Sequence, residues 1–308
     1  MKKAMLSNII VFLKGMAMGI ADIIPGVSGG TIAIITGIYE EFLSTLNNIN
    51  LKIIKLLFKG KFKFLWEKYN LSFLSSLILG ILTSVILLSY SITYLIVNYP
   101  IILWSFFLGL IASSIIYLFK EIKIWNRKTY LFLYIGLFFS LVMLTIYPSK
   151  QEEVSFIYLF FCGMISITAM LLPGVSGAYI LVLLGAYETI LNTLKEVIKF
   201  NSDYFLNFFS FIIGAILSIK LFSKLLTWAY KKHKNYTLSC LVGFMIGSLP
   251  NLWPWKSELN SEELLFSKLY IPVGYFMNAD FRKGILFILI GILMIFILEY
   301  LAKKSKNV

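Results

Sequence analysis

The sequence carries the same five residues, Pro-Gly-Val-Ser-Gly, at 25–29 and again at 173–177. Each block can end one helix and start another, because proline lacks an N–H and glycine adopts backbone angles that other residues avoid. The serine of each block, Ser28 or Ser176, is placed to cap the helix that follows. The first N–H groups of a helix lack partners and carry partial positive charge. The pattern therefore favours binding of an anion, phosphate or carboxylate.

The candidate anion ligands are the small and hydroxylated residues of the two blocks and of the positions just after the first block. They are Gly26, Ser28, Gly29, Gly30 and Thr31 in the first block, and Gly174, Ser176 and Gly177 in the second. A helical hairpin that uses its glycines only for close packing would show the same motif. A single copy favours that structural interpretation, whereas two copies favour a ligand site.

Charged residues inside apolar segments are functional candidates by default. Asp22 stands three residues before the first block. Its carboxylate could carry a coupling proton or cation, orient an N–H of the break, or cap nearby backbone. Lys14 could pair with Asp22 or with an anionic head group, or extend to the cytoplasmic edge. Lys220 is a further candidate for the head group.

Two glutamates, Glu40 and Glu188, occupy equivalent positions after the two blocks, and each follows a tyrosine, Tyr39 or Tyr187. Anchoring at the membrane interface accounts for the tyrosines. For the glutamates, a role in gating or in proton relay is the more specific hypothesis.

The composition predicts an all-α polytopic membrane protein. Apolar residues make up 59% of the 308 residues and charged residues 14%, against about 45–50% and about 25% in globular domains. Apolar stretches long enough to span a bilayer recur along the chain. With one histidine and two cysteines, a metal site, a cofactor or a Ser-His-Asp enzyme is not expected. The net charge of +13 lies in the connectors, so no nucleic-acid partner is expected.

The chain contains an internal duplication. Residues 12–46 match residues 160–194 at 16 of 35 positions, with an offset of 148. Weaker matches follow at an offset of 134, and they comprise Ser76/Ser210, Gly80/Gly214, Ser84/Ser218, Gly109/Gly243 and Ser114/Ser248. Each copy is therefore interpreted as a helical hairpin followed by three spans.

The duplication gives the expected boundaries of one integral membrane domain. The first repeat, 1–150, has a hairpin at 4–46 and spans at 71–97, 101–119 and 129–147; the second, 151–308, has a hairpin at 154–194 and spans at 204–229, 236–252 and 284–301. Each hairpin arm has about twenty residues, enough to cross the membrane completely. We expect the broken, re-entrant form, and full crossing is the alternative.

Parity makes the two repeats inverted relative to each other. A hairpin returns to its own side, and three further spans place the second copy on the opposite face. Inverted repeats with broken helices are typical of transporters with alternating access and a central site. An N-terminus in the cytoplasm puts most lysines and arginines in cytoplasmic connectors and the C-terminus on the same side, as the positive-inside rule favours.

These motifs resemble the signature of a bacterial and archaeal membrane family described as polyprenyl-phosphate transporters. The resemblance rests on Gly19 to Thr31 with Gly37-Ile38-Tyr39-Glu40, and on Leu172 to Gly177 with Gly185-Ala186-Tyr187-Glu188. It covers essentially the whole chain, and Ala178-Tyr179 departs from the expected pattern. The motif residues that it carries over are Asp22, Pro25 to Thr31, Glu40, Pro173 to Gly177 and Glu188.

The resemblance implies a flippase that recycles undecaprenyl phosphate, the lipid carrier of wall polymers, across the bacterial cytoplasmic membrane, with possible proton or cation coupling. Secondary transport of a small soluble anion is the main alternative. A lipid needs a gap that opens toward the bilayer, whereas a soluble ion needs an aqueous vestibule. An intramembrane lipid-phosphate phosphatase is a weaker alternative. Its chemistry needs an activated nucleophile or a metal, and the single histidine, His233, lies on a cytoplasmic connector.

Overall fold

The computed structural model describes residues 2–23, 27–49, 62–146, 154–255 and 279–306, and these residues form helices joined by short connectors. The chain divides into two compact units. Unit 1 comprises residues 1–86 and 147–232, and unit 2 comprises residues 87–146 and 233–308. Each unit therefore draws on both halves of the sequence.

Several helices are long and apolar enough to cross a membrane, which makes the chain an all-helical, multi-pass membrane protein. Among the described residues there are four such helices: α6 (Leu71–Asn98), α7 (Pro100–Glu121), α8 (Arg127–Thr145) and α12 (Phe205–Lys232). A bent pair of shorter helices meets the same test of length and composition when its two parts are taken together.

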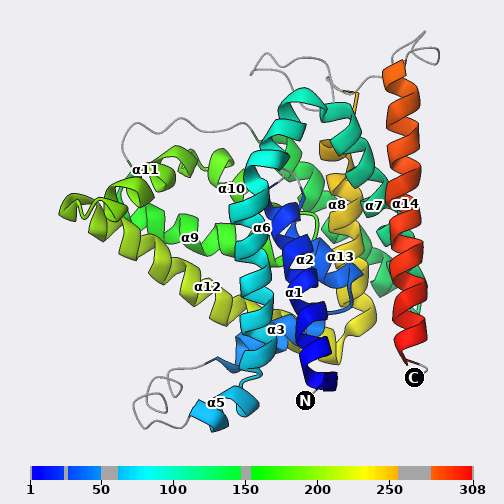
Figure 1. Cartoon of the computed structure of the whole chain (residues 1–308), viewed down its shortest axis with the longest axis horizontal. Coiled ribbons are helices and arrows are strands. Elements are labelled where there is room, and N and C mark those ends of the chain that lie inside the picture. Colours follow the sequence, from blue (N-terminus) through cyan, green and yellow to red (C-terminus); the bar gives the residue numbers. More distant parts are fainter. Residues whose placement is uncertain (1, 24–26, 50–61, 147–153, 256–278, 307–308) are drawn as a thin grey trace. The chain divides into compact units, whose positions relative to one another are not determined.

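Unit 1 holds both predicted hairpins (Figure 1). The first hairpin consists of α1 (Lys2–Ile23), α2 (Gly29–Ile35) and α3 (Tyr39–Asn48). The second consists of α9 (Phe156–Leu171), α10 (Gly177–Leu183) and α11 (Tyr187–Ile198). Among the described residues, Val27 and Ser28 of the first block and Pro173 to Ser176 of the second are not helical, as the sequence predicts.

The second arm of each hairpin differs from the single helix of about twenty residues that hydropathy predicts. Gly37 (φ 72°) and Gly185 (φ 66°) adopt left-handed backbone and end α2 and α10. The next N–H groups, those of Ile38 and Ala186, donate back to Ala33 and Leu181, as in a Schellman motif. In the second hairpin the chain then turns by 109° into α11. Two short helices therefore replace one long arm.

Equivalent glycines bring equivalent helices together in unit 1. A Cβ placed on Gly15 of α1 would overlap the carbonyl oxygen of Leu77 in α6, and one placed on Gly163 of α9 would overlap that of Phe211 in α12. Gly15 and Gly163 are related by the offset of 148, and Leu77 and Phe211 by the offset of 134. The reciprocal contacts, Gly80 with Phe12 and Gly214 with Phe160, follow the same rule. Small residues let membrane helices approach this closely.

Unit 2 pairs α7 with α14 (Ala279–Lys306) and α8 with α13 (Lys234–Ser248), which continues into η2 (Leu249–Leu252). Gly109 of α7 packs against the Ile288 carbonyl, and Gly243 of α13 packs against the Leu133 carbonyl. The reciprocal contacts are Gly291 with Phe106 and Gly136 with Cys240. The two helix pairs thus share one contact pattern, in which α8 corresponds to α14 at an offset of 155.

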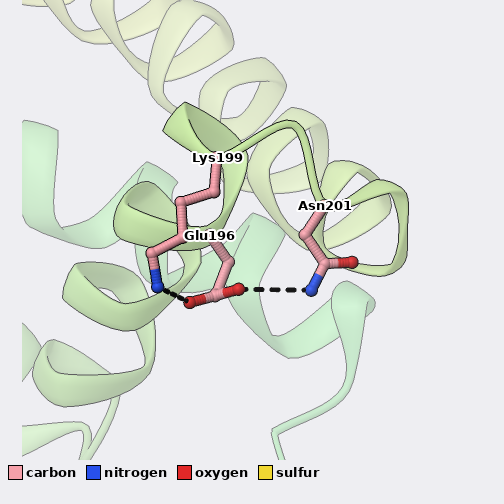
Figure 2. A network of polar contacts seen from close by, with 3 residues as sticks. All are labelled: Glu196, Lys199 and Asn201. Carbon is pink, nitrogen blue, oxygen red and sulfur yellow. Dashed lines mark hydrogen bonds and ion pairs between the residues drawn. The ribbon is translucent and has the colours of Figure 1, made fainter.

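A polar network closes the turn between α11 and α12, next to η1 (Ser202–Tyr204). Figure 2 shows Glu196 between its two partners, with Lys199 Nζ 2.7 Å from Oε1 and Asn201 Nδ2 3.2 Å from Oε2. Phe200 between them has a φ of 62° and is 85% exposed. Exposed ion pairs contribute little to stability, so the network sets the local turn rather than the fold.

We predict that Gly80→Ala lowers the thermal stability of the purified protein. At an exposed position inside a helix, a change from glycine to alanine raises the free energy of unfolding by up to about 1 kcal/mol. Here the new Cβ would overlap the Phe12 carbonyl oxygen, and overpacking costs about 1–3 kcal/mol. Leu79→Ala is the control, because that side chain lies on the same helix and is 57% exposed. A Gly80→Ala protein that melts above wild type would contradict the close approach of α1 and α6.

Candidate functional site

The two helix breaks lie directly against one another within unit 1. The hydroxyl of Ser28, in the first break, donates to the carbonyl oxygens of Leu172 (3.2 Å) and Met170 (3.4 Å). In the opposite sense, the N–H of Gly174 in the second break donates to the Thr31 hydroxyl (2.9 Å). We call these two contacting breaks the break junction, formed by residues 28–31 and 170–177.

A buried tyrosine completes the break junction. The phenol of Tyr39, at the start of α3, donates to the Leu171 carbonyl at 2.8 Å. Its ring also meets that of Tyr230 edge-on, with ring centroids 6.3 Å apart. Tyr39 is only 3% exposed, so the expectation that it anchors at the membrane interface is wrong. Its counterpart Tyr187 is 37% exposed.

The two serines cap the helices that follow, as the sequence predicts. The Ser28 side chain accepts from the Gly30 N–H at 3.1 Å. The Ser176 side chain accepts from the Tyr179 N–H at 3.4 Å. Both serines are buried, so each satisfies a donor that water does not reach. The Ser28 hydroxyl serves both breaks, because it also donates across the junction.

Asp22 occupies the N-terminus of α2. Its Oδ1 accepts from the Gly29 N–H at 2.7 Å, whereas its Oδ2 is buried without a hydrogen-bond partner among the described residues. A Cβ on Gly29 would lie 2.6 Å from that Oδ2, so only glycine leaves room for the carboxylate. In the second hairpin Met170 lies against Gly177 in the equivalent place. The junction therefore has one anionic side and one neutral side.

The amides of the first break are thus already engaged. Asp22 holds the Gly29 N–H and Ser28 holds the Gly30 N–H. In the second break, by contrast, the N–H groups of Gly177 and Ala178 have no hydrogen-bond acceptor within the part of the chain that the structure describes. An anion that used the first break would have to replace the carboxylate of Asp22.

The two candidate lysines bind backbone carbonyls at the ends of the short helices. Lys14 Nζ donates to the Thr36 carbonyl at 2.7 Å, rather than to Asp22. Lys220 Nζ, on α12, donates to the carbonyls of Asn47 and Ile49 at the end of α3. Cations stabilise helix C-termini in this way. Both ammonium groups therefore stabilise the broken first hairpin in this arrangement.

The second hairpin replaces the Lys14 contact with a neutral one. Tyr158 donates its hydroxyl to the Leu184 carbonyl at 2.7 Å, and Leu184 is the counterpart of Thr36 at the offset of 148. The counterpart of Lys14 is the buried Cys162. Lys14 and Asp22 of the first hairpin thus have no charged equivalents in the second.

The remaining predicted residues are exposed or lie outside the described residues. Glu40 and Glu188 are exposed in the first turns of α3 and α11. Gly26 lies outside the described residues. Sequence analysis missed the role of Tyr39 in the junction, although the motif Gly-x-Tyr-Glu recurs in both repeats and could have indicated it.

Helices broken at a shared polar junction are typical of membrane transporters. Residues 18–267 match the VCA0040-like family, described as undecaprenyl phosphate translocase-like. The chain therefore belongs to this family. No solved structure matches the chain.

Two relatives carry the name polyprenyl-phosphate transporter. The protein of Vibrio cholerae is 38% identical over 249 residues, which cover 81% of this chain and 79% of the relative. The protein of Staphylococcus aureus is 32% identical over 260 residues, which cover 80% of this chain and 86% of the relative. The similarity to both extends over most of each chain.

We predict that Tyr39→Phe destabilises the folded protein by about 1–3 kcal/mol, because the buried Leu171 carbonyl loses its hydrogen-bond donor. The matched control is Tyr187→Phe at the equivalent, more exposed position, for which we expect a change below about 0.5 kcal/mol. Thermal unfolding in detergent measures both. Equal effects of the two substitutions would show that the Tyr39 hydroxyl does not hold the junction.

Proposed function

We propose that this protein flips undecaprenyl phosphate, or a related polyprenyl phosphate, across the bacterial cytoplasmic membrane so that the carrier lipid is reused in cell-envelope synthesis. The observation that carries the proposal is the break junction, where two helix breaks place polar backbone and hydroxyl groups among apolar helices. The names of the two relatives support the same substrate class. The polyprenyl tail stays in the bilayer while the phosphate crosses.

The proposed architecture is a pair of inverted repeats, with both chain termini in the cytoplasm. Glycines that the internal duplication relates make equivalent helix contacts in both units, which supports two copies of one structural element. Three spans after each hairpin make the copies inverted. Transporters with this design bind substrate between their repeats, and the break junction brings one break of each repeat together.

The phosphate binds at the break junction in this proposal. Ser28, Gly29, Gly30 and Thr31 supply hydroxyl and amide donors from the first repeat, and Gly174, Ser176 and Gly177 supply those of the second. Because Asp22 now holds the Gly29 N–H, the phosphate and the carboxylate compete for one donor. Lys14 and Lys220 provide positive charge in the same unit. Protonation of Asp22 would weaken this competition and couple binding to a proton.

The two hairpins occupy different environments, which supports alternating access. In the first hairpin Tyr39 and Leu43 are buried, at 3% and 1% exposure, whereas their counterparts Tyr187 and Leu191 are 37% and 41% exposed. Inverted repeats can exchange such environments, and the exchange would open the opposite side. Glu40 and Glu188 then act as gating or relay groups at the two mouths. Each is exposed at the first turn of its helix.

Liposomes that contain the purified protein and a polyprenyl phosphate test this function. We expect the protein to move the phosphate from the inner to the outer leaflet. Gly29→Leu should reduce that rate at least about tenfold, because its side chain would overlap the Asp22 carboxylate and small displacements in a site cost that much or more. Leu79→Phe, on an exposed face, controls for membrane insertion. Wild-type flipping by Gly29→Leu would refute the site assignment.

The same liposomes separate the main alternative. A secondary transporter of a small anion would take up inorganic phosphate without exposing the lipid phosphate. Exposed lipid phosphate without uptake of inorganic phosphate is the result that the proposal requires. Uptake of inorganic phosphate without exposure of lipid phosphate would instead indicate that the break junction binds a soluble substrate.

We predict that Asp22→Asn removes the dependence of transport on the proton gradient. Asparagine keeps an oxygen that can accept from the Gly29 N–H but cannot bind and release a proton in the physiological range. Asp203→Asn, in the exposed turn before α12, is the matched control. If Asp22→Asn transport keeps the wild-type response to pH and gradient, Asp22 has only a structural role.

A further inference from the structure

Unit 2 contains a surface hollow of about 450 Å³ at the junction of α7 and α8, lined by Ile116, Phe119, Lys120, Trp125 and Tyr130. The glycine breaks belong to unit 1, so the hollow is no part of the break junction. The helices on both sides are long and apolar enough to cross a membrane. The hollow therefore lies where two spans meet the water interface.

Aromatic rings form the wall of the hollow. Phe119 and Trp125 stack nearly parallel, with ring centroids 5.3 Å apart and planes 16° apart. The Tyr130 ring packs against Trp125 at a tilt of 44°, with ring centroids 5.1 Å apart. Tryptophan and tyrosine favour the head-group level of a bilayer. Here they are packed against each other and border a space, which distinguishes them from isolated anchors.

The connector that carries Trp125 is held by hydrogen bonds at both ends. Asn126 caps α8 by accepting from the Thr129 N–H at 3.0 Å, and the Thr129 hydroxyl donates to the Ile124 carbonyl at 2.9 Å. The N–H of Lys123 donates to the side chain of Asn235, on α13, at 3.1 Å. These contacts hold the backbone of the connector that carries Trp125.

The charge around the hollow is strongly positive. The exposed cations of this segment are Lys120, Lys123, Arg127 and Lys128, and Glu121 is its one acidic residue. None of the four cations forms an ion pair within the residues that the structure describes. One turn from Lys120, Ile116 is 56% exposed, so the hollow passes from a cationic rim to an apolar helix face. This gradient matches the head group and acyl chain of an anionic lipid.

We propose that this hollow binds an anionic glycerophospholipid, with its phosphodiester at Lys120 and its glycerol and upper acyl chains against Trp125 and Ile116. Basic pockets between transmembrane helices bind such head groups. The lysine distribution places this end of unit 2 at the cytoplasmic surface. The lipid would stabilise the α7–α8 junction and does not itself cross the membrane.

Fluorescence quenching tests this site in reconstituted full-length protein. Trp125→Phe identifies the part of the emission that Trp125 contributes among the six tryptophans. Phosphatidylglycerol with brominated chains should quench that part several-fold more than brominated phosphatidylcholine at the same mole fraction. Equal quenching by the two lipids would overturn the proposal, because ordinary interfacial anchoring predicts no preference for the anion.

Charge variants provide the second measurement. Lys120→Gln with Lys123→Gln should weaken the effect of phosphatidylglycerol about 25-fold, because each of the two cations near the surface strengthens anionic lipid binding about fivefold. The matched control, Lys195→Gln with Lys224→Gln, makes the same charge change on unit 1 and should leave quenching unchanged. Melting in phosphatidylcholine alone verifies that both variants fold. If the control loses as much quenching, the effect depends only on the net charge of the protein, and the proposed site is wrong.

A competition arm separates the possible phosphate sources. Unlabelled phosphatidylglycerol should restore the Trp125 emission, whereas inorganic phosphate and polyprenyl phosphate at equal concentration should not. Restoration by polyprenyl phosphate at lower concentration than by phosphatidylglycerol would show that the hollow serves the transported lipid, which contradicts the proposal.

Discussion

A broken helix inside a membrane exposes backbone N–H and C=O groups that neither water nor lipid can satisfy. This structure meets that constraint by placing the two breaks together. Ser28 and Tyr39 donate to carbonyls of the second hairpin, and Thr31 accepts from its backbone. Several of the hydrogen bonds that one break lacks are therefore supplied by the other. The glycines that let α1 approach α6 and α9 approach α12 position the two breaks for this contact.

The same contacts suit the break junction to bind and release an anion. The donors of the first break are engaged by Asp22 and Ser28, so an incoming phosphate replaces protein acceptors instead of leaving bare amides behind. A buried donor without a partner costs about 1–3 kcal/mol, and this exchange avoids that cost in both states. Asp22 has no charged counterpart in the second hairpin, where Met170 takes its place. The two halves of the proposed cycle therefore differ in charge.

Much of this organisation could be predicted from the sequence, because hydropathy, proline and glycine act locally. The all-helical membrane class, the two breaks and the serine caps of α2 and α10 follow from such signals. The end of α2 at Gly37 was missed because continuous hydrophobicity hides a left-handed turn. The match between α8 and α14 was missed because it lies at a third offset, 155, at which Arg127-Lys128 and Ile135-Gly136 recur as Arg282-Lys283 and Ile290-Gly291. Lys14 and Lys220 bind carbonyls that only the folded chain brings within their reach.

The central claim is that the phosphate of the carrier lipid contacts the glycine amides of the break junction. Solid-state NMR of glycine-¹⁵N protein with bound polyprenyl phosphate measures the distance from phosphorus to these nitrogens directly. A hydrogen-bonded amide and phosphate place the two nuclei about 4 Å apart. We predict that the ³¹P nucleus of the bound lipid dephases the glycine ¹⁵N signals at that distance. Protein without lipid, in which Asp22 and Ser28 hold these amides, should show no such dephasing. Bound lipid whose phosphorus shows no glycine nitrogen at that distance would contradict the account.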